Sequence, residues 1–113
     1  MSLYAKDGVR IRGICPELVL GLMVVRDVFT EYEAACIITS CVDGRHSETS
    51  LHPAGRAVDL RSKHLGDDKI SLRNACKARL GSFGDFDFIL EGLNTPNEHF
   101  HMEYQPKTSA GVL

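Results

Sequence analysis

The sequence predicts an α+β domain in which a small, mainly antiparallel sheet carries helices on one face and leaves the other face open. Three observations lead to this class. Two segments show apolar residues at helical spacing, and several short segments are β-branched or alternate between apolar and polar residues. The two kinds of segment occur in the order helix, two strands, helix, two strands.

The first helix is expected at residues 16–31. Pro16 suits the first turn of a helix, and Glu17 suits its positive end. Apolar residues at helical spacing follow, from Leu18 to Phe29. Ahead of this helix, residues 9–13 could form a short strand or an edge segment.

The remaining elements follow from alternation and from turn residues. Residues 34–42 are β-branched and apolar, which is typical of a buried strand. Asp67 and Asp68 are expected to open a second helix, which Gly81 ends. The other expected elements are a polar loop at 43–50 and strands at 56–61, 86–90 and 99–104.

Length and composition indicate one globular domain over residues 1–113, with a flexible tail at 106–113. Of the 113 residues, 43% are hydrophobic and 25% are charged, as in ordinary globular proteins. The longest apolar run, at 18–25, is too short to span a membrane. The net charge of −2 gives no electrostatic support for a nucleic-acid partner.

The cysteines and the first residues predict a cytoplasmic site of synthesis. The N-terminal residues carry charges where a signal peptide has an apolar segment. The four cysteines, at positions 15, 36, 41 and 76, form no C-x-x-C pair. We therefore expect them to be small buried side chains and not a disulfide framework.

Strand alternation predicts that two polar side chains share the open face of the sheet. If the large apolar residues of 56–61 face the core, Asp59 points the other way. The same reasoning applied to 99–104 leaves His99 and His101 on the open face. Asp59 and His101 are therefore expected to lie together.

His52 and Glu98 extend this pair to a candidate zinc site. His52 is out of phase with Asp59, but Pro53 and Gly55 are turn residues that could bring it back. Two histidines and one carboxylate form a catalytic zinc set with a fourth position left for water. Glu98, where the chain enters the last strand, would lie near one bound Zn2+ ion and accept a proton. A histidine pair on a strand is a weak indication by itself, and the combination of both segments carries the prediction.

The two segments also match the motifs of a known family. "SLHPAGRAVD", residues 50–59, fits the pattern S-x-H-x-x-G-x-A-x-D at every fixed position, and "EHFH", residues 98–101, fits E-x-x-H. The chain thus resembles the zinc D-alanyl-D-alanine metallopeptidases, within the wider lysostaphin-like group. This family includes D-Ala-D-Ala carboxypeptidases and dipeptidases and bacteriophage L-alanyl-D-glutamate endolysins, and hedgehog domains share a similar core.

The resemblance implies a role for each matching residue. His52, Asp59 and His101 correspond to the zinc ligands, and Glu98 corresponds to the general base. Ser50 would lie at the substrate-binding edge.

Two further residues have an open assignment. Arg45 is similar to the arginine that the family places before the first motif, where it binds substrate and stabilises oxyanion charge. This chain reads "TSCVDGR" where the family often has T-S-G-x-R, so an exposed loop arginine is the alternative. His99 could hydrogen-bond the substrate or be a solvated strand histidine.

The function implied by the resemblance is zinc-dependent hydrolysis of a peptide bond in peptidoglycan stem peptides. A minimal phage or prophage L-Ala-D-Glu endolysin fits best, acting as a monomer that reaches the cell wall through a holin. One alternative is a D-Ala-D-Ala carboxypeptidase or dipeptidase. A second is a zinc-bearing binding module that does not hydrolyse. The expected partner is peptidoglycan or a muropeptide.

Overall fold

Five strands form one mixed sheet in the computed structural model, which describes residues 2–42 and 55–105. The strands are β1 (Leu3–Ala5), β2 (Cys36–Ser40), β3 (Ala57–Leu60), β4 (Phe86–Glu91) and β5 (His99–Tyr104). Their order across the sheet is β1-β2-β3-β5-β4. β1 runs parallel to β2, and the other neighbouring pairs are antiparallel.

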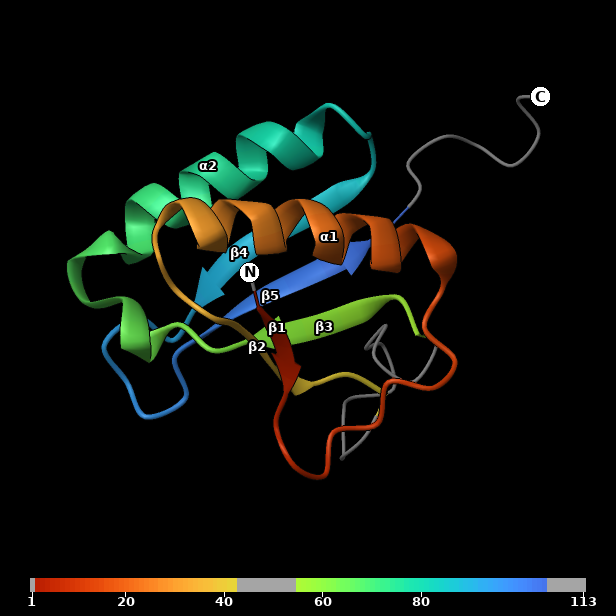
Figure 1. The fold of residues 1–113 in the computed structure, drawn as a ribbon, viewed down its shortest axis with the longest axis horizontal. Coiled ribbons are helices and arrows are strands. Elements are labelled where there is room, and N and C mark those ends of the chain that lie inside the picture. The colour runs from red at the N-terminus through yellow and green to blue at the C-terminus, as the bar shows by residue number, and fades with distance from the viewer. Residues whose placement is uncertain (1, 43–54, 106–113) are drawn as a thin grey trace.

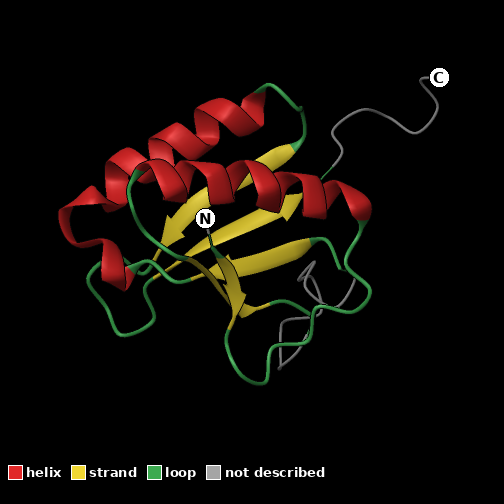
Figure 2. Ribbon diagram, in the orientation of Figure 1, coloured by secondary structure: helices red, strands yellow, loops and turns green. Residues whose placement is uncertain are grey.

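Two α-helices, α1 (Pro16–Glu31) and α2 (Lys69–Gly81), lie on one side of this sheet (Figure 1). A 3-10 segment, Lys63–Asp68, leads into α2. Figure 2 shows that no helix of the described residues covers the opposite face. The predicted α+β class, with helices on one face of the sheet, is therefore confirmed.

Most predicted elements occur where the sequence placed them. α1 has the predicted bounds, and α2 begins directly after Asp68. Residues 9–13 do not form the predicted short strand. The Arg10 carbonyl does accept a hydrogen bond of 3.0 Å from the Val42 amide. β1 was not predicted, because its three residues are all exposed and show no alternation.

The core lies between the helices and the sheet. Phe100 packs edge-on against Phe29 of α1, with ring centroids 6.0 Å apart, and lies 5.2 Å from the ring of Phe88. Each large apolar side chain that is fully buried contributes about 1.5–3 kcal/mol relative to an exposed one. The other large buried side chains are Leu18, Leu22, Val25, Val28, Ile38, Val58, Leu60, Leu65, Leu72, Leu80 and Met102.

The four cysteines are free thiols, and three of them are buried as predicted, whereas Cys15 is only partly buried. Cys36, Cys41 and Cys76 are fully buried in the core. Burial raises the pKa of Cys36 to about 12, and burial raises the pKa of Cys76 as well. Cys36 and Cys76 are therefore neutral packing groups at physiological pH.

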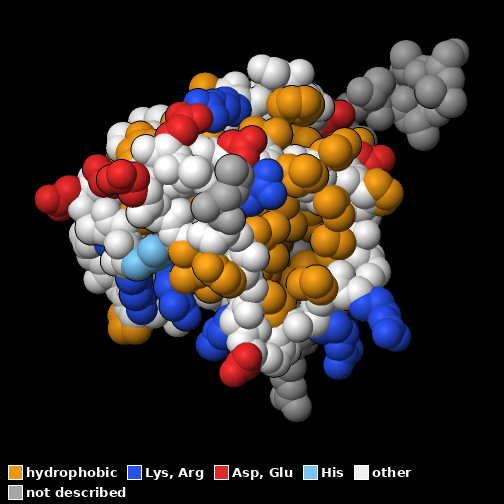
Figure 3. Space-filling view, in the orientation of Figure 1, with side chains coloured by type: hydrophobic (Ala, Val, Ile, Leu, Met, Phe, Trp, Pro, Cys, Tyr) orange, Lys and Arg blue, Asp and Glu red, His pale blue; other side chains and the backbone are white. Residues whose placement is uncertain are grey.

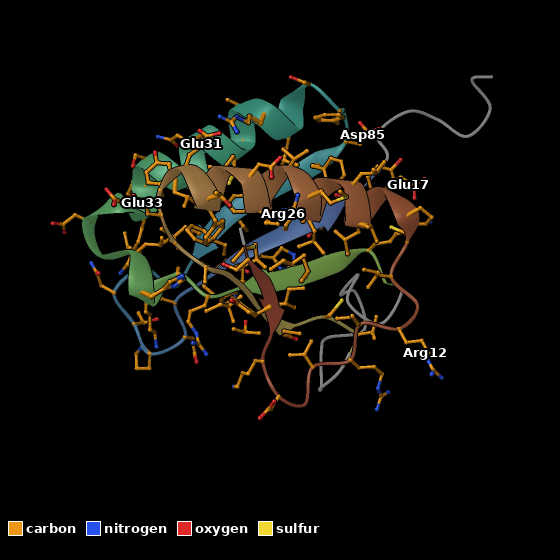
Figure 4. The ribbon with its side chains drawn as sticks, viewed as in Figure 1. Arg12, Glu17, Arg26, Glu31, Glu33 and Asp85 are labelled. Atoms are coloured by element: carbon orange, nitrogen blue, oxygen red, sulfur yellow. The ribbon has the colours of Figure 1, made fainter. Side chains whose placement is uncertain are left out.

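The outer surface of α1 is apolar in its first half. Val19, Leu20 and Met23 are exposed, and apolar side chains gather on the face of the molecule that carries α1 (Figure 3). Toward its end, Glu31 (labelled in Figure 4) pairs with Arg79 of α2, with Oε1 2.6 Å from Nη2. Neither helix of the described ranges is long and apolar enough to cross a membrane.

Gly55 has a structural reason to be glycine. Its φ of +75° lies in the left-handed region, and a Cβ there would overlap the backbone carbonyl of Gly13. The Gly55 carbonyl also accepts a hydrogen bond of 2.9 Å from the Cys15 amide. The chain just before α1 therefore packs against the turn that leads into β3.

We expect Gly55→Ala to lower the free energy of unfolding by about 2–4 kcal/mol, because it adds backbone strain and a clash with backbone atoms. Gly81→Ala is the matched control, since a Cβ at Gly81 would meet no atom within 4 Å. The control should stay within about 1 kcal/mol of the native chain. Urea denaturation followed by circular dichroism measures both, and equal stability of the two variants would contradict the close packing at Gly55.

Candidate functional site

Asp59 and His101 lie directly opposite each other on neighbouring strands. The antiparallel register of β3 and β5 pairs these two residues. The His101 ring donates a hydrogen bond from Nδ1 to Asp59 Oδ1 at 2.8 Å. The prediction that alternation brings the two side chains together on the open face is confirmed.

Glu103 engages the other nitrogen of the same imidazole. His101 Nε2 lies 2.8 Å from Glu103 Oε1, two residues further along β5. The hydrogen bond to Asp59, supported by the one to Glu103, raises the pKa of His101 to about 9 despite its partial burial. His101 is therefore an imidazolium at neutral pH, held between two carboxylates.

The donor types of this pair fit a zinc ion. An imidazole nitrogen and a carboxylate oxygen are both common zinc ligands, and here they face each other with side chains only 16% and 17% exposed. A carboxylate on the second ring nitrogen, as Glu103 provides, is the usual partner of a metal-bound histidine. Metal binding at His101 would displace a proton from the ring.

His99 lies beside Asp59 on the same face. Its Nδ1 donates a hydrogen bond of 2.5 Å to the Asn97 carbonyl, which fixes the ring. Its Nε2 lies 3.2 Å from Glu91 Oε1 and 3.8 Å from Asp59 Oδ1. The predicted substrate-binding histidine is thus close enough to the Asp59–His101 pair to contact a group bound there.

Glu98 is held in a buried polar cluster. Its carboxylate accepts hydrogen bonds from Ser62 Oγ at 2.6 Å, from Lys69 Nζ at 2.8 Å and from the Asn94 amide at 3.0 Å. The side chain is only 1% exposed. The cluster ties the start of β5 to the beginning of α2.

These contacts set the charge of Glu98. Burial alone would raise its pKa, but the hydrogen bonds from Lys69, Ser62 and the Asn94 amide outweigh it and lower the pKa to about 2. Glu98 is therefore ionised at neutral pH, as a proton acceptor must be. Its low pKa also makes it a weak base in this arrangement.

A cleft of about 370 Å³ connects these groups. Asp59, His99 and Glu98 contribute to its lining, and so do the basic residues Lys6 and Arg61. No motif in the sequence indicated a role for either basic residue. Arg61 lies two residues after Asp59, so strand alternation puts it on the same face, whereas nothing pointed to Lys6 because β1 was not predicted.

Three predicted site residues, Arg45, Ser50 and His52, lie outside the described residues. Of the first motif, the structure describes Gly55, Ala57 and Asp59. No group of three or more His, Cys, Asp or Glu side chains in the described part of the chain is arranged to hold a metal. The predicted zinc set includes His52, which lies outside the described residues, so this absence does not bear on it.

Comparison with known proteins adds no assignment. No family model, curated protein or solved structure matches the chain. The fold and the site therefore define an α+β domain with an Asp–His pair on the open face of its sheet.

The lowered pKa of Glu98 predicts a specific pH dependence of stability. Its pKa falls from 4.5 to about 2 on folding, so its contribution is present in full above 4.5 and is lost as the pH falls toward 2. We expect the stability of the native chain to fall more steeply over this range than that of Glu98→Gln. The difference in slope should be at most about 1.4 kcal/mol per pH unit.

Urea denaturation at several pH values measures these slopes. Glu17→Gln is the control, because Glu17 is an exposed carboxylate at the start of α1 (Figure 4) and is not one of the hydrogen-bond partners of Glu98. This variant leaves the Glu98 cluster intact, so the loss of stability attributed to Glu98 should remain. If the native chain and Glu98→Gln had the same slope, the hydrogen-bonded cluster would not lower the pKa of Glu98.

Proposed function

We propose that this chain is a zinc-dependent peptidase that hydrolyses a peptide bond in peptidoglycan stem peptides. The observation that carries the proposal is the Asp59–His101 pair, with 2.8 Å between a carboxylate oxygen and an imidazole nitrogen on the open face. Its two members belong to the two motifs that resemble the zinc D-alanyl-D-alanine metallopeptidases. A minimal phage or prophage L-Ala-D-Glu endolysin remains the proposed context.

In this proposal Asp59 and His101, together with His52, hold the zinc ion. When bound, zinc supplies Lewis-acid chemistry, which polarises a carbonyl and lowers the pKa of water. Glu103 orients the His101 ring through Nε2. His99, with Nε2 3.8 Å from Asp59 Oδ1, hydrogen-bonds the substrate at the reacting carbonyl.

Glu98 is the proposed proton acceptor. It is ionised, and it lines the same cleft as Asp59 and His99. In this role it takes a proton from the attacking water and returns it to the leaving amine. It must exchange at least one of its present hydrogen bonds to do so, because Lys69, Ser62 and the Asn94 amide occupy its carboxylate.

One observation favours a second candidate function, a zinc-bearing binding module without hydrolysis. A carboxylate with a pKa of about 2, held by an ammonium group, is a poor general base and a good structural anchor. Such a module would bind stem peptides at the same face. The two functions differ in turnover but share the zinc ligands.

The zinc ligands can be tested by metal content. We expect the native chain to bind one zinc ion, and Asp59→Asn and His101→Gln to weaken zinc binding by about a hundredfold or more, since each removes a ligand. His64→Gln is the control, because His64 is an exposed histidine outside the cleft, with Nε2 2.8 Å from the Ala35 carbonyl. Mass spectrometry of dialysed, zinc-supplemented protein gives the stoichiometry, and a native chain without zinc would rule out the proposal.

The catalytic carboxylate can be tested by two matched substitutions. We expect Glu98→Gln to lower kcat for stem-peptide cleavage by about 10²–10⁴-fold, because it removes a general base. Glu91→Gln, a change at the exposed carboxylate beside His99, should retain most of the activity. Zinc content and unfolding curves of both variants show whether each remains folded and loaded.

The products of the same reaction identify the substrate. A new N-terminal D-Glu indicates the L-Ala-D-Glu endopeptidase, and free D-alanine indicates the D-Ala-D-Ala carboxypeptidase or dipeptidase. Zinc and peptide binding without any cleavage by the native chain would instead establish the binding module. Loss of activity in Glu91→Gln and not in Glu98→Gln would transfer the role of base to Glu91.

A further inference from the structure

Three basic side chains line the cleft that adjoins Asp59. They are Lys6, Arg61 and Lys63. The chain as a whole carries a net charge of −2, so the concentration of positive charge in one hollow does not reflect its overall composition. All three residues are exposed, so their charges are accessible to a ligand in the cleft.

The backbone fixes the positions of two of these residues. Lys6 follows β1, and its amide donates a hydrogen bond of 2.8 Å to the Ile38 carbonyl of β2. Arg61 follows β3, and its amide donates a hydrogen bond of 2.9 Å to the Ile37 carbonyl of the same strand. Lys6 and Arg61 are thus anchored on opposite sides of β2, at the ends of its two neighbours.

Lys63 lines the same cleft. Its ammonium group donates a hydrogen bond of 2.5 Å to the Pro96 carbonyl, in the loop that leads to β5. An ammonium group has three donors, so this contact leaves donors for a ligand. The three cations therefore come from two segments of the chain, Lys6 after β1 and residues 61–63 after β3, and border one hollow.

The acidic side chains that border the cleft do not neutralise these cations. Asp59 is hydrogen-bonded to His101, and Glu98 is paired with Lys69. Within the described residues, neither Lys6 nor Arg61 has an ion-pair partner. A guanidinium and an ammonium group directed at one cleft match the charge of a carboxylate, and Arg can bind it through two parallel hydrogen bonds.

We propose that this cleft is a subsite for a free carboxylate of the peptide substrate, next to the residues that hold the metal. The inference deepens the proposed function and rests on it for the identity of the peptide. In a stem peptide the carboxylate has two possible sources, the α-carboxylate of D-Glu or the C-terminal carboxylate of D-Ala. Lys6 and Arg61 bind the carboxylate in either case, and a substrate with a carboxamide at that position binds more weakly.

Binding can be measured without relying on turnover. The probes are N-acetyl-L-alanyl-D-glutamate, with its side-chain carboxyl blocked as a methylamide, and diacetyl-L-lysyl-D-alanyl-D-alanine. Each is compared with its own carboxamide. Amide chemical shifts of the full chain report binding, and the peptide signals in the same samples report any cleavage, so failure of the subsite and failure of hydrolysis are seen separately.

The variant is Lys6→Met with Arg61→Met, and the control is Lys77→Met, an exposed lysine of α2 outside the cleft. We expect the double variant to weaken binding of the favoured acid by about threefold to tenfold, without affecting its carboxamide. The control should bind like the native chain, and added salt should weaken binding of the acid. We expect the variants to fold, because the substitutions retain the backbone amides that bond both positions to β2. Circular dichroism checks this.

Comparing each acid with its carboxamide distinguishes the two possible sources of the carboxylate, D-Glu and the terminal D-Ala. A preference for the D-Glu acid over its amide supports an endopeptidase subsite, and a preference for the D-alanyl acid supports a terminal subsite. Equal binding of acid and carboxamide for both probes would overturn the inference, even if the chain cleaves them. Equal weakening by Lys77→Met and the double variant would overturn it as well.

Discussion

The antiparallel register between β3 and β5 is the constraint on which the site depends. It places Asp59 opposite His101, and every other group of interest is positioned relative to that pair. A slip of one residue would turn one partner toward the core and the other toward solvent. The register is fixed because Val58 and Leu60 on one strand, and Phe100 and Met102 on the other, fill the core on the opposite face.

The titratable residues of β5 and the residue just before it, Glu98, belong to two separate groups of contacts. Residues that point to the open face carry titratable groups that interact with one another, while Glu98 is held apart in a polar cluster with Lys69 and Ser62. A carboxylate with so many donors adds rigidity where the 92–98 loop meets α2. Structural and catalytic demands on Glu98 therefore compete, because the contacts that hold it also lower its basicity.

Much of the fold and one pair of the site could be predicted from the sequence. Helical spacing gave α1 with its observed bounds, and strand alternation alone brought Asp59 to His101. The partners of Glu98 could not be predicted, because Lys69 and Ser62 come from a different part of the chain and carry no periodic signal. β1 could not be predicted for a related reason. It is short and exposed, so its sequence shows no alternation, and it forms a strand through its pairing with β2.

The contact between Gly55 and Gly13 has a consequence for how the two halves of the chain relate. The glycine of the first motif lies against backbone that precedes α1, and its carbonyl is bonded to the Cys15 amide. The turn of the histidine–aspartate motif at Gly55 therefore depends on contacts with the chain segment before α1. A graft of residues 50–104 onto another scaffold would leave this turn without its supporting wall, so the N-terminal segment and the motif are expected to change together during evolution.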